Sequence, residues 1–345
     1  MSGGGAARRF AIGSYTPDGP GPGLHLVERS ADGEWRVLAS AEASNASFVA
    51  RSGDLLAAVG EDESGSVSTF RVVGDAIEPV DSVEHGETHP CHVVVDAAAG
   101  VVLVANYGSG SVTAVPVDAA GSLGRPSTLA LPPRTGPVAD RQEAPHAHQV
   151  VPTPWGTHVV SDLGGDALHE FAIDPAETTD AATATLRIVR TIELAPGTGP
   201  RHLLVRDGVL HVVGELDGHL HSFEVDATSA RAAGTEPAVV RPPADDDDVV
   251  QPSHLDVAPS GRQFTVTVRG RDAVSVFDAT DAAHPRVAAE HPIGARWPRH
   301  HAHVDDRTVV VAAQEGDALV EVDLVTGGTR RALDLTAPAC ILPLD

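Results

Sequence analysis

Residues 141–171 read RQEAPHAHQVVPTPWGTHVVSDLGGDALHEF, and this stretch contains the unit from which the whole chain is built. A histidine pair precedes a short apolar run, a turn separates it from a second run, and a DLGGD turn precedes a third. Short runs of alternating apolar and polar residues between Gly/Asp turns are typical of β-strands. The stretch therefore predicts three consecutive strands.

The second half of this unit recurs along the chain. Successive turn starts, from Glu61 to Ala313, are 45 to 56 residues apart. The clear copies are VANYGSGSVTAV (104–115), VSDLGGDALHEF (160–171), VVGELDGHLHSF (212–223), VTVRGRDAVSVF (266–277) and VAAQEGDALVEV (311–322), with looser ones at 10–27 and 56–70. One short strand precedes each copy and a weaker one follows it. Four strands in each repeat of this length predict a blade of a β-propeller.

The strand count predicts a ring closed by both ends of the chain. Six units begin with an inner strand, at Asn45, His89, Pro145, Gly199, Pro252 and Trp297. Residues 9–43 supply only three outer strands, and residues 338–344 form a lone strand of the inner type. Joining them gives a seventh blade and leaves no open sheet edge. We predict an all-β fold, a seven-bladed β-propeller with four-stranded blades, as one domain over residues 9–345 after a disordered segment 1–8.

Composition narrows the class of function. Hydrophobic residues make up 42% of the 345 residues but aromatic ones only 3%, so the core must consist of Val, Leu and Ala. The net charge of −24 argues against nucleic acid or an anionic membrane as a partner. Two cysteines do not make a disulfide framework, and no apolar run reaches the roughly 18 residues of a membrane span. We expect a soluble, cytoplasmic protein that acts on a small molecule.

One position of the inner strands carries histidine in most blades. Counting back from each turn start assigns it to His92, His148, His202, His254 and His300, with Phe48 and Cys340 in the other two blades. Inner strands line the channel of a propeller, so these side chains are expected there. A repeated histidine can also hydrogen-bond the neighbouring blade. This alternative stays open, and for His254 we favour it.

A second position, one residue after each turn start, is expected at the mouth of the channel. Arg201 and Arg299 directly precede two of the histidines. Histidine can act as a base at neutral pH, while arginine suits a carboxylate, a phosphate or a developing oxyanion. Together with an ionised glutamate, these groups suit the opening of an anionic ester or lactone by water. The second position holds Tyr107, Leu163, Glu215, Arg269 and Gln314.

Motifs along the whole chain carry a family resemblance. They are IGSYT (12–16), HPCHVVVD (89–96), ANYGSGSV (105–112), RQEAPHAHQV (141–150), DLGGD (162–166), GPRHL (199–203), GEL (214–216), VRGRDAVSVF (268–277) and WPRH (297–300). With them the chain resembles the lactonase family of seven-bladed propellers. This family includes propeller-type 6-phosphogluconolactonases and the carboxymuconate-lactonising enzyme.

The resemblance implies an active site of one histidine, two arginines and one glutamate, which fall on His148, Arg201, Arg269 and Glu215. We expect His148 to activate water, and Arg201 and Arg269 to bind the substrate anion and the oxyanion. Glu215 would position Arg201 or return a proton to the leaving alkoxide. The other residues expected in the pocket are His92, Tyr107, Arg141, His146, His202, Arg299 and His300.

No cofactor is expected, since the chain has no HExxH, G-x-S-x-G or P-loop motif. His300, His301 and His303 cannot all face one way on a strand, so we predict no metal. Two further functions stay open. One is a lactonising enzyme that adds a carboxylate to a diene. The other is a non-catalytic propeller used as a binding scaffold, because propellers host many unrelated functions.

Overall fold

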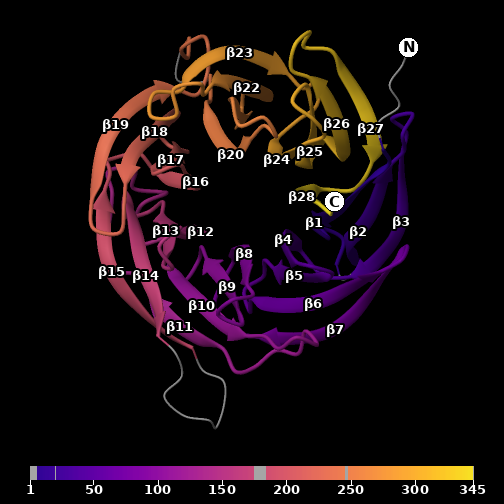
Figure 1. The fold of residues 1–345 in the computed structure, drawn as a ribbon, viewed down its shortest axis with the longest axis horizontal. Coiled ribbons are helices and arrows are strands. Elements are labelled where there is room, and N and C mark those ends of the chain that lie inside the picture. The colour runs from indigo at the N-terminus through magenta and orange to yellow at the C-terminus, as the bar shows by residue number, and fades with distance from the viewer. Residues whose placement is uncertain (1–5, 20, 175–183, 245–247, 345) are drawn as a thin grey trace.

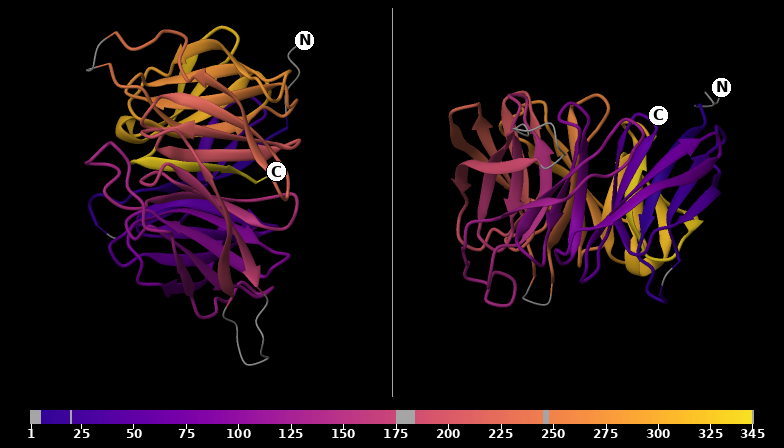
Figure 2. Two further views of the ribbon diagram at one scale, coloured as in Figure 1. Left: turned by 90° about the vertical axis from the view of Figure 1, so that its left-hand side faces the viewer. Right: turned by 90° about the horizontal axis from the view of Figure 1, so that it is seen from below.

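Seven four-stranded antiparallel sheets stand side by side in a closed ring around a central axis (Figure 1). The edge-on views of Figure 2 show the strands of successive sheets stacked against one another around this ring. The computed structural model describes residues 6–19, 21–174, 184–244 and 248–344. The prediction of a seven-bladed propeller is confirmed.

Blades are numbered here in chain order, and each is given from its inner to its outer strand. Blade 1 contains β28 (Pro338–Pro343), β1 (Arg8–Ser14), β2 (Pro22–Arg29) and β3 (Trp35–Glu42); blade 2 contains β4 (Ala46–Ser52), β5 (Leu55–Gly60), β6 (Ser66–Val73) and β7 (Ala76–Glu84). Blade 3 contains β8 (Pro90–Asp96), β9 (Val101–Asn106), β10 (Ser111–Pro116) and β11 (Ser127–Ala130); blade 4 contains β12 (Ala147–Pro152), β13 (His158–Asp162), β14 (Ala167–Asp174) and β15 (Thr185–Glu193).

The last three blades follow the same order. Blade 5 contains β16 (Pro200–Arg206), β17 (Val209–Gly214), β18 (His219–Val225) and β19 (Ala230–Pro237); blade 6 contains β20 (Gln251–Val257), β21 (Gln263–Arg269), β22 (Ala273–Asp278) and β23 (Arg286–Pro292). Blade 7 contains β24 (Pro298–His303), β25 (Thr308–Ala313), β26 (Ala318–Asp323) and β27 (Thr329–Asp334).

The ring is closed by the pairing of the two ends of the chain, as predicted. Strand β28 pairs antiparallel with β1, with Phe10 opposite Pro343 and Ile12 opposite Ile341. Strand β1 begins at Arg8, which pairs with Arg29, so the ordered fold starts inside the segment 1–8 that was expected to be disordered. Residues 1–5 of that segment lie outside the described residues.

The apolar core is divided among the seams between blades. Seven buried clusters are present, and each joins two neighbouring blades. For example, Leu103 of blade 3 packs with Val150 and Phe171 of blade 4. Small aliphatic residues dominate these clusters, as the low aromatic content requires. Each blade is therefore held by its two neighbours, and the inner strands are fixed relative to one another.

Helical structure within the described ranges is a single 3-10 turn, Gln314–Gly316. The described part of the chain accordingly contains no helix long and apolar enough to cross a membrane. The tract 242–248 is irregular where it is described, and residues 245–247 lie outside the description.

Candidate active site at the mouth of the channel

A repeated backbone hydrogen bond defines one end of the channel. The residue at this end of the second strand donates its backbone N–H to the carbonyl before the inner strand. Tyr107 donates to His89 over 2.9 Å, and Glu215 donates to Gly199 over 2.8 Å. We name the residues at this position the mouth ring: Tyr15, Glu61, Tyr107, Leu163, Glu215, Arg269 and Gln314.

A second irregularity recurs just inside the mouth. In every blade the pairing of the inner strand with the second strand shifts register near the start of the inner strand. In blade 5 the shift lies between Pro200 and Leu203, and in blade 4 between Ala147 and Val150. A β-bulge places an extra residue opposite one partner and re-aims its side chain. The side chains of two consecutive residues of each inner strand can therefore point into the channel.

The strand pairing assigns these residues to two further layers. The middle ring, nearer the mouth, contains Ser47, Cys91, His148, Arg201, Ser253, Arg299 and Ala339. The floor ring, one residue deeper, contains Phe48, His92, Gln149, His202, His254, His300 and Cys340.

This register corrects one prediction. His148 is not equivalent to His92, because Ala147 pairs with Asp162 as Pro90 pairs with Asn106. The residue of blade 4 that corresponds to His92 is Gln149. His148 shares the position of Arg201 and Arg299 instead. Counting residues back from the turn gave the wrong assignment because the hairpin formed by the inner and second strands is one residue shorter in blade 4 than in blade 3.

The floor ring links neighbouring blades. The backbone N–H of Val150 donates to Nδ1 of His92 over 3.4 Å, and that of Ile341 donates to Nδ1 of His300 over 3.4 Å. The amide oxygen of Gln149 accepts the equivalent bond from Leu203. These contacts give His92 and His300, which we expected to line the substrate pocket, a structural task as acceptors for the next blade.

The floor ring also fills the channel. The ring centroid of His202 lies between 5.0 and 6.4 Å from those of Phe48, His92, His254 and His300. His202 and His254 contact each other through their Nδ1 atoms at 2.8 Å. The mouth side of this layer is therefore the side on which a substrate can meet the middle ring.

Glu215 is the centre of the charged groups at the mouth. Its Oε2 lies 2.9 Å from Nε of Arg201 and 2.5 Å from Nη2 of Arg269, and its Oε1 accepts a 2.5 Å hydrogen bond from Arg141. The glutamate and the first two arginines are buried, whereas the side chain of Arg141 is 30% exposed. Arg201 and Arg269 thus converge on one carboxylate oxygen. Their strands, β16 and β21, belong to adjacent blades 5 and 6, whose inner strands β16 and β20 are labelled in Figure 1.

The electrostatics of this cluster keep Glu215 and Arg201 charged. Burial by itself would raise the pKa of Glu215. The charges of Arg269 and Arg201 lower this pKa by more than burial raises it, so it lies well below its usual range. Burial and the charge of Arg269 lower the pKa of Arg201 to about 9, with Glu215 acting in the opposite direction. At neutral pH, Arg201 remains a guanidinium cation and Glu215 a carboxylate.

His148 lies beside this cluster as a neutral imidazole. Burial first, and then the charge of Arg201, hold the pKa of His148 well below 6.5. Its Nδ1 lies 3.8 Å from Sγ of Cys91, and its ring meets that of Tyr107 edge-on with centroids 5.6 Å apart. The thiol of Cys91 is buried, and burial raises its pKa far above its usual value. His148 therefore has a free electron pair at neutral pH.

Two aspartates of the DLGGD turn position the strands that carry His148 and Arg201. Oδ1 of Asp162 accepts the backbone N–H of His146 over 2.8 Å, which fixes the start of β12. The carboxylate of Asp166 accepts the N–H groups of Gly197 and Gly199 over 2.7 and 2.8 Å, which fixes the start of β16. Each carboxylate thus holds the backbone at a residue that precedes a middle-ring residue by two positions: His146 precedes His148, and Gly199 precedes Arg201.

Arg141 and His146 enter the site from the loop before β12. Gln142, which is fully buried, anchors this loop by donating to the carbonyl of Leu163 over 2.9 Å and to Asp166 over 2.8 Å. His146 stacks on Tyr107, and its Nδ1 contacts the backbone oxygen of Tyr107 at 2.9 Å. His146 thus supports Tyr107 at the rim, while Arg141 reaches Glu215.

A second charged group at the mouth was not predicted. Glu61 Oε2 lies 3.3 Å from Nη2 of Arg299 and accepts a 2.7 Å hydrogen bond from the hydroxyl of Tyr15. The guanidinium of Arg299 also lies over the ring of Tyr15, 5.1 Å from its centroid. Burial lowers the pKa of Arg299, but the nearby Tyr15 and Glu61 raise it by more. Arg299 is therefore a cation at neutral pH. Of these three residues, only Arg299 was expected in the pocket.

Glu61 and Tyr15 could have been found by completing the ring. They occupy the mouth position in blades 2 and 1, where the repeats are loosest and the turn in blade 2 was placed one residue late. Trp297, which packs on the guanidinium of Arg269 at 5.3 Å, was likewise missed. Trp297 directly precedes inner strand β24, so its position in the repeat could have indicated that it lies at the mouth.

Guanidiniums gather at the mouth although the chain carries a net charge of −24. Four guanidiniums, from Arg141, Arg201, Arg269 and Arg299, face the carboxylates of Glu215 and Glu61. Among these six groups the arginines outnumber the carboxylates by two. The arrangement can bind an anion next to a neutral imidazole.

The mouth of this seven-bladed propeller brings together paired guanidiniums, a carboxylate and an imidazole. Such a pocket is typical of enzymes that act on small molecules. The chain matches the family model "Lactonase, 7-bladed beta-propeller" over residues 9–341. The protein belongs to this lactonase family, and the resemblance seen in the motifs is confirmed.

Individual relatives agree with this assignment. A 6-phosphogluconolactonase of Bacillus subtilis is 32% identical over 249 residues, which cover 69% of this chain and 67% of the relative. A candidate 6-phosphogluconolactonase from Bacteroides fragilis has a structure with a TM-score of 0.87 at 22% identity, with 100% of both chains covered. The periplasmic gluconolactonase of Pseudomonas aeruginosa has a TM-score of 0.84 at 23% identity, with 99% of both chains covered. At these identities the two structures support the fold.

Proposed function

We propose that this lactonase hydrolyses the lactone of a negatively charged sugar acid, with 6-phosphogluconolactone as the first candidate. The observation that carries the proposal is the convergence of Arg201 and Arg269 on Oε2 of Glu215, beside the neutral imidazole of His148. The relative in Bacillus subtilis, a 6-phosphogluconolactonase, supports the choice of substrate. A cytoplasmic location, where sugar phosphates occur, is part of this proposal.

The partly exposed arginines receive the substrate. Arg141 and Arg299 have side chains that are 30% and 16% exposed, whereas Arg201 is 2% exposed. A phosphate or carboxylate of the substrate would therefore meet Arg141 and Arg299 first. Charge-assisted bonds to guanidinium groups are strong and directional, which would orient the lactone ring over the middle ring.

His148 is the proposed general base. It takes a proton from water as the water oxygen bonds to the lactone carbonyl carbon, and the carbonyl oxygen becomes an oxyanion. Arg201 and Arg269 stabilise this oxyanion. Because Glu215 holds both guanidiniums in place before the reaction, little reorganisation is required when the charge develops.

Ring opening completes the cycle. The bond between the carbonyl carbon and the ring oxygen breaks, and the departing alkoxide takes the proton from the imidazolium of His148. The products are a carboxylic acid and a hydroxyl group, and the imidazole is again neutral. Glu215, whose pKa is held low by its arginines, stays ionised throughout and serves to position them.

The test is acid release from 6-phosphogluconolactone, followed in a pH-stat and corrected for spontaneous hydrolysis. The wild-type protein should accelerate it, and His148→Gln should lose most of that acceleration. His211→Gln is a matched control, because His211 is buried in blade 5 and bonds Ser222 away from the mouth.

If neither 6-phosphogluconolactone nor gluconolactone opens faster than in buffer, hydrolysis of sugar lactones is ruled out. Turnover of a muconate by the same protein would then favour the lactonising alternative. A folded protein that turns over neither class would favour the binding scaffold.

A further inference from the structure

A cluster of histidine and aspartate lies in the seam between blades 6 and 7, away from the charged mouth. Asp256 is on β20, and His301 and His303 are on β24. Within the parts of the chain that the structure describes, these three residues form the one group of His, Cys, Asp and Glu whose geometry suits a metal ion. One ligand atom from each residue lies within 4.8 Å of those of the other two.

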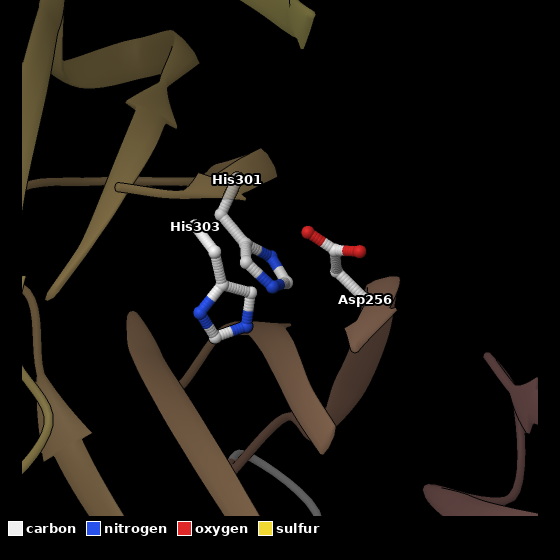
Figure 3. Close-up of side chains that lie close together, drawn as sticks. All are labelled: Asp256, His301 and His303. Atoms are coloured by element: carbon white, nitrogen blue, oxygen red, sulfur yellow. The ribbon is translucent and has the colours of Figure 1, made fainter. Parts of the chain in front are cut away.

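The three side chains face one another (Figure 3). The ring of His301 lies between the carboxylate of Asp256 and the ring of His303. Residues 301 and 303 point to the same side of β24, whereas the intervening backbone step turns His300 toward the channel, where it stacks on His254 with centroids 3.5 Å apart. The three histidines thus do not all face one way, but two of them share a side with Asp256.

The nitrogens of both histidines are aimed by a shared partner. Oγ1 of Thr265 on β21 lies 2.7 Å from Nε2 of His301 and 2.8 Å from Nε2 of His303. Thr265 is directly opposite Asp256 in the pairing of β20 with β21. The hydroxyl therefore holds two imidazole edges in the same small volume that Asp256 borders.

His303 and Asp256 make hydrogen bonds to the backbone that orient them as metal ligands require. Nδ1 of His303 lies 3.2 Å from the backbone oxygen of Asp305, to which its N–H can donate, and this leaves Nε2 as an electron-pair donor. A hydrogen bond of this kind on the far nitrogen is typical of metal-binding histidine. The carboxylate of Asp256 accepts the backbone N–H of Val257 over 2.8 Å and that of His303, which fixes its orientation.

One nitrogen of the cluster is left without a partner. His301 is fully buried, and its Nδ1 has no hydrogen-bond partner among the described residues. A buried polar atom without a partner is costly, and an ion bound within the cluster would remove that cost.

We propose that Asp256, His301 and His303 bind one divalent transition-metal ion, with Zn²⁺ as the best fit. Two imidazole nitrogens and one carboxylate oxygen are ligands that zinc accepts, while Mg²⁺ and Ca²⁺ prefer oxygen alone. Ligands of a tetrahedral zinc ion lie about 3.4 Å apart, so the cluster needs only small side-chain rotations to close on the ion. The Thr265 hydroxyl or a water would occupy the fourth position.

The role of this ion is to fasten blade 7 to blade 6. Asp256 and His303 lie toward the end of their inner strands that is farther from the mouth, whereas Arg299 lies next to the mouth. The proposal is therefore independent of the proposed lactone hydrolysis. Binding of the ion stabilises the folded state in proportion to its affinity and leaves the mouth unchanged.

The test titrates Zn²⁺ into the full-length, untagged protein after treatment with EDTA and dialysis, using calorimetry and thermal unfolding. We expect one equivalent to bind and the unfolding temperature to rise. Co²⁺ should bind in place of Zn²⁺ and show the visible absorption bands of a tetrahedral nitrogen–oxygen site. Loss of an outer-shell partner typically weakens metal binding about 10- to 100-fold, so loss of a ligand in Asp256→Asn, His301→Gln or His303→Gln should weaken it more.

Background binding is controlled within the same chain, which has 18 histidines. His158 lies 3.2 Å from Asp96 in the seam between blades 3 and 4, and the described residues add no third ligand to this pair, so His158→Gln should bind the ion as the wild type does. Should His301→Gln fail to fold, Asp256→Asn still gives the answer, because Asp256 is partly exposed. Absence of saturable binding, or equal binding by wild type and Asp256→Asn, would overturn the proposal.

Discussion

His148 on β12 and Arg201 on β16 occupy equivalent positions in neighbouring blades. Each directly follows the residue that pairs with the end of the second strand, Ala147 opposite Asp162 and Pro200 opposite Gly214. Each lies at the bulge that interrupts the inner strand. The proposed base and a proposed oxyanion ligand are thus two versions of one repeated position, held at the same depth by the same backbone irregularity.

Removing the proposed base should abolish chemistry without weakening substrate binding. In His148→Gln we expect kcat to fall by about 10²- to 10⁴-fold with KM changed little, since a general base contributes roughly this factor. Initial rates over a range of lactone concentrations measure both constants. An unchanged kcat would show that another group activates the water.

The pH dependence of the wild-type enzyme should lack a histidine limb near 6.5. Burial and Arg201 lower the pKa of His148 in the free enzyme, so the base form already dominates below pH 6.5. The value of kcat/KM, which reports on the free enzyme, should therefore stay flat from pH 8 down to about 6 and fall only in more acidic buffer. A midpoint at or above 6.5 would contradict this environment for His148.

Neutralising Glu215 should disorganise the arginines. In Glu215→Gln, two buried guanidiniums lose their counter-charge, so we expect destabilisation of about 3–5 kcal/mol and a loss of kcat/KM of at least about a hundredfold. Denaturant unfolding and steady-state kinetics measure the two effects. Glu170→Gln is the matched control: it breaks the buried Arg190–Glu170 pair far out in blade 4 and should destabilise the fold while activity remains.

Arg299 should select for charged substrates. In Arg299→Gln we expect KM for 6-phosphogluconolactone to rise about tenfold, the loss of roughly one charge-assisted hydrogen bond, with less than a twofold change for uncharged gluconolactone. The double variant Arg299→Gln/Glu61→Gln removes the unpaired carboxylate left by the single change. It should regain stability but not affinity. Equal losses for both lactones would show that Arg299 does not contact the charged group.

His92 should be replaceable by glutamine but not by alanine. Gln149 makes the same contact to the next blade in blade 4 that His92 makes in blade 3. His92→Gln should therefore keep KM within about twofold and unfold near the wild-type temperature, whereas His92→Ala leaves a buried N–H of Val150 unpaired at a cost of about 1–3 kcal/mol. A large rise in KM for His92→Gln would instead place His92 in the substrate pocket.

The floor ring should make the protein sensitive to mild acid. Burial and Arg201 lower the pKa of His92 to about 3 in the folded state from 6.5 in the unfolded chain. Because the unfolded state then binds more protons, stability is complete above pH 6.5 and falls by about 1.4 kcal/mol per pH unit below it for each such histidine. Unfolding by denaturant between pH 7 and 5 measures the slope. His92→Gln should reduce that slope by about one proton.

The fold and the family could be predicted from the sequence because each repeat is recognisable from short local patterns. Alternating residues and Gly/Asp turns predict each hairpin, and the missing strands at the two ends predict how the ring closes. The groups at the mouth were also largely accessible: Glu215 and Arg269 follow turns, and Arg201 precedes a histidine in the GPRH motif.

The depth of each side chain was not accessible, because a bulge changes register without changing composition. The first inner-strand residue and its partner at the end of the second strand are 16 positions apart in blade 3, from Pro90 to Asn106, but 15 apart in blade 4, from Ala147 to Asp162, so counting from the turn misplaced His148 by one residue. The Glu61–Arg299–Tyr15 group was missed for a related reason. Its members come from blades 2, 7 and 1, and they meet only when the ring has closed.

The pairing of β28 with β1 also sets the order in which the molecule can be finished. During synthesis β1, β2 and β3 emerge within the first 42 residues, yet their inner partner begins only at Pro338. At about 5–20 residues per second, the apolar edge that bears Phe10 and Ile12 waits roughly 15–60 s for its partner. Blade 1 is thus begun first and completed last, and a nascent chain carries an unpaired strand edge for nearly the whole of translation.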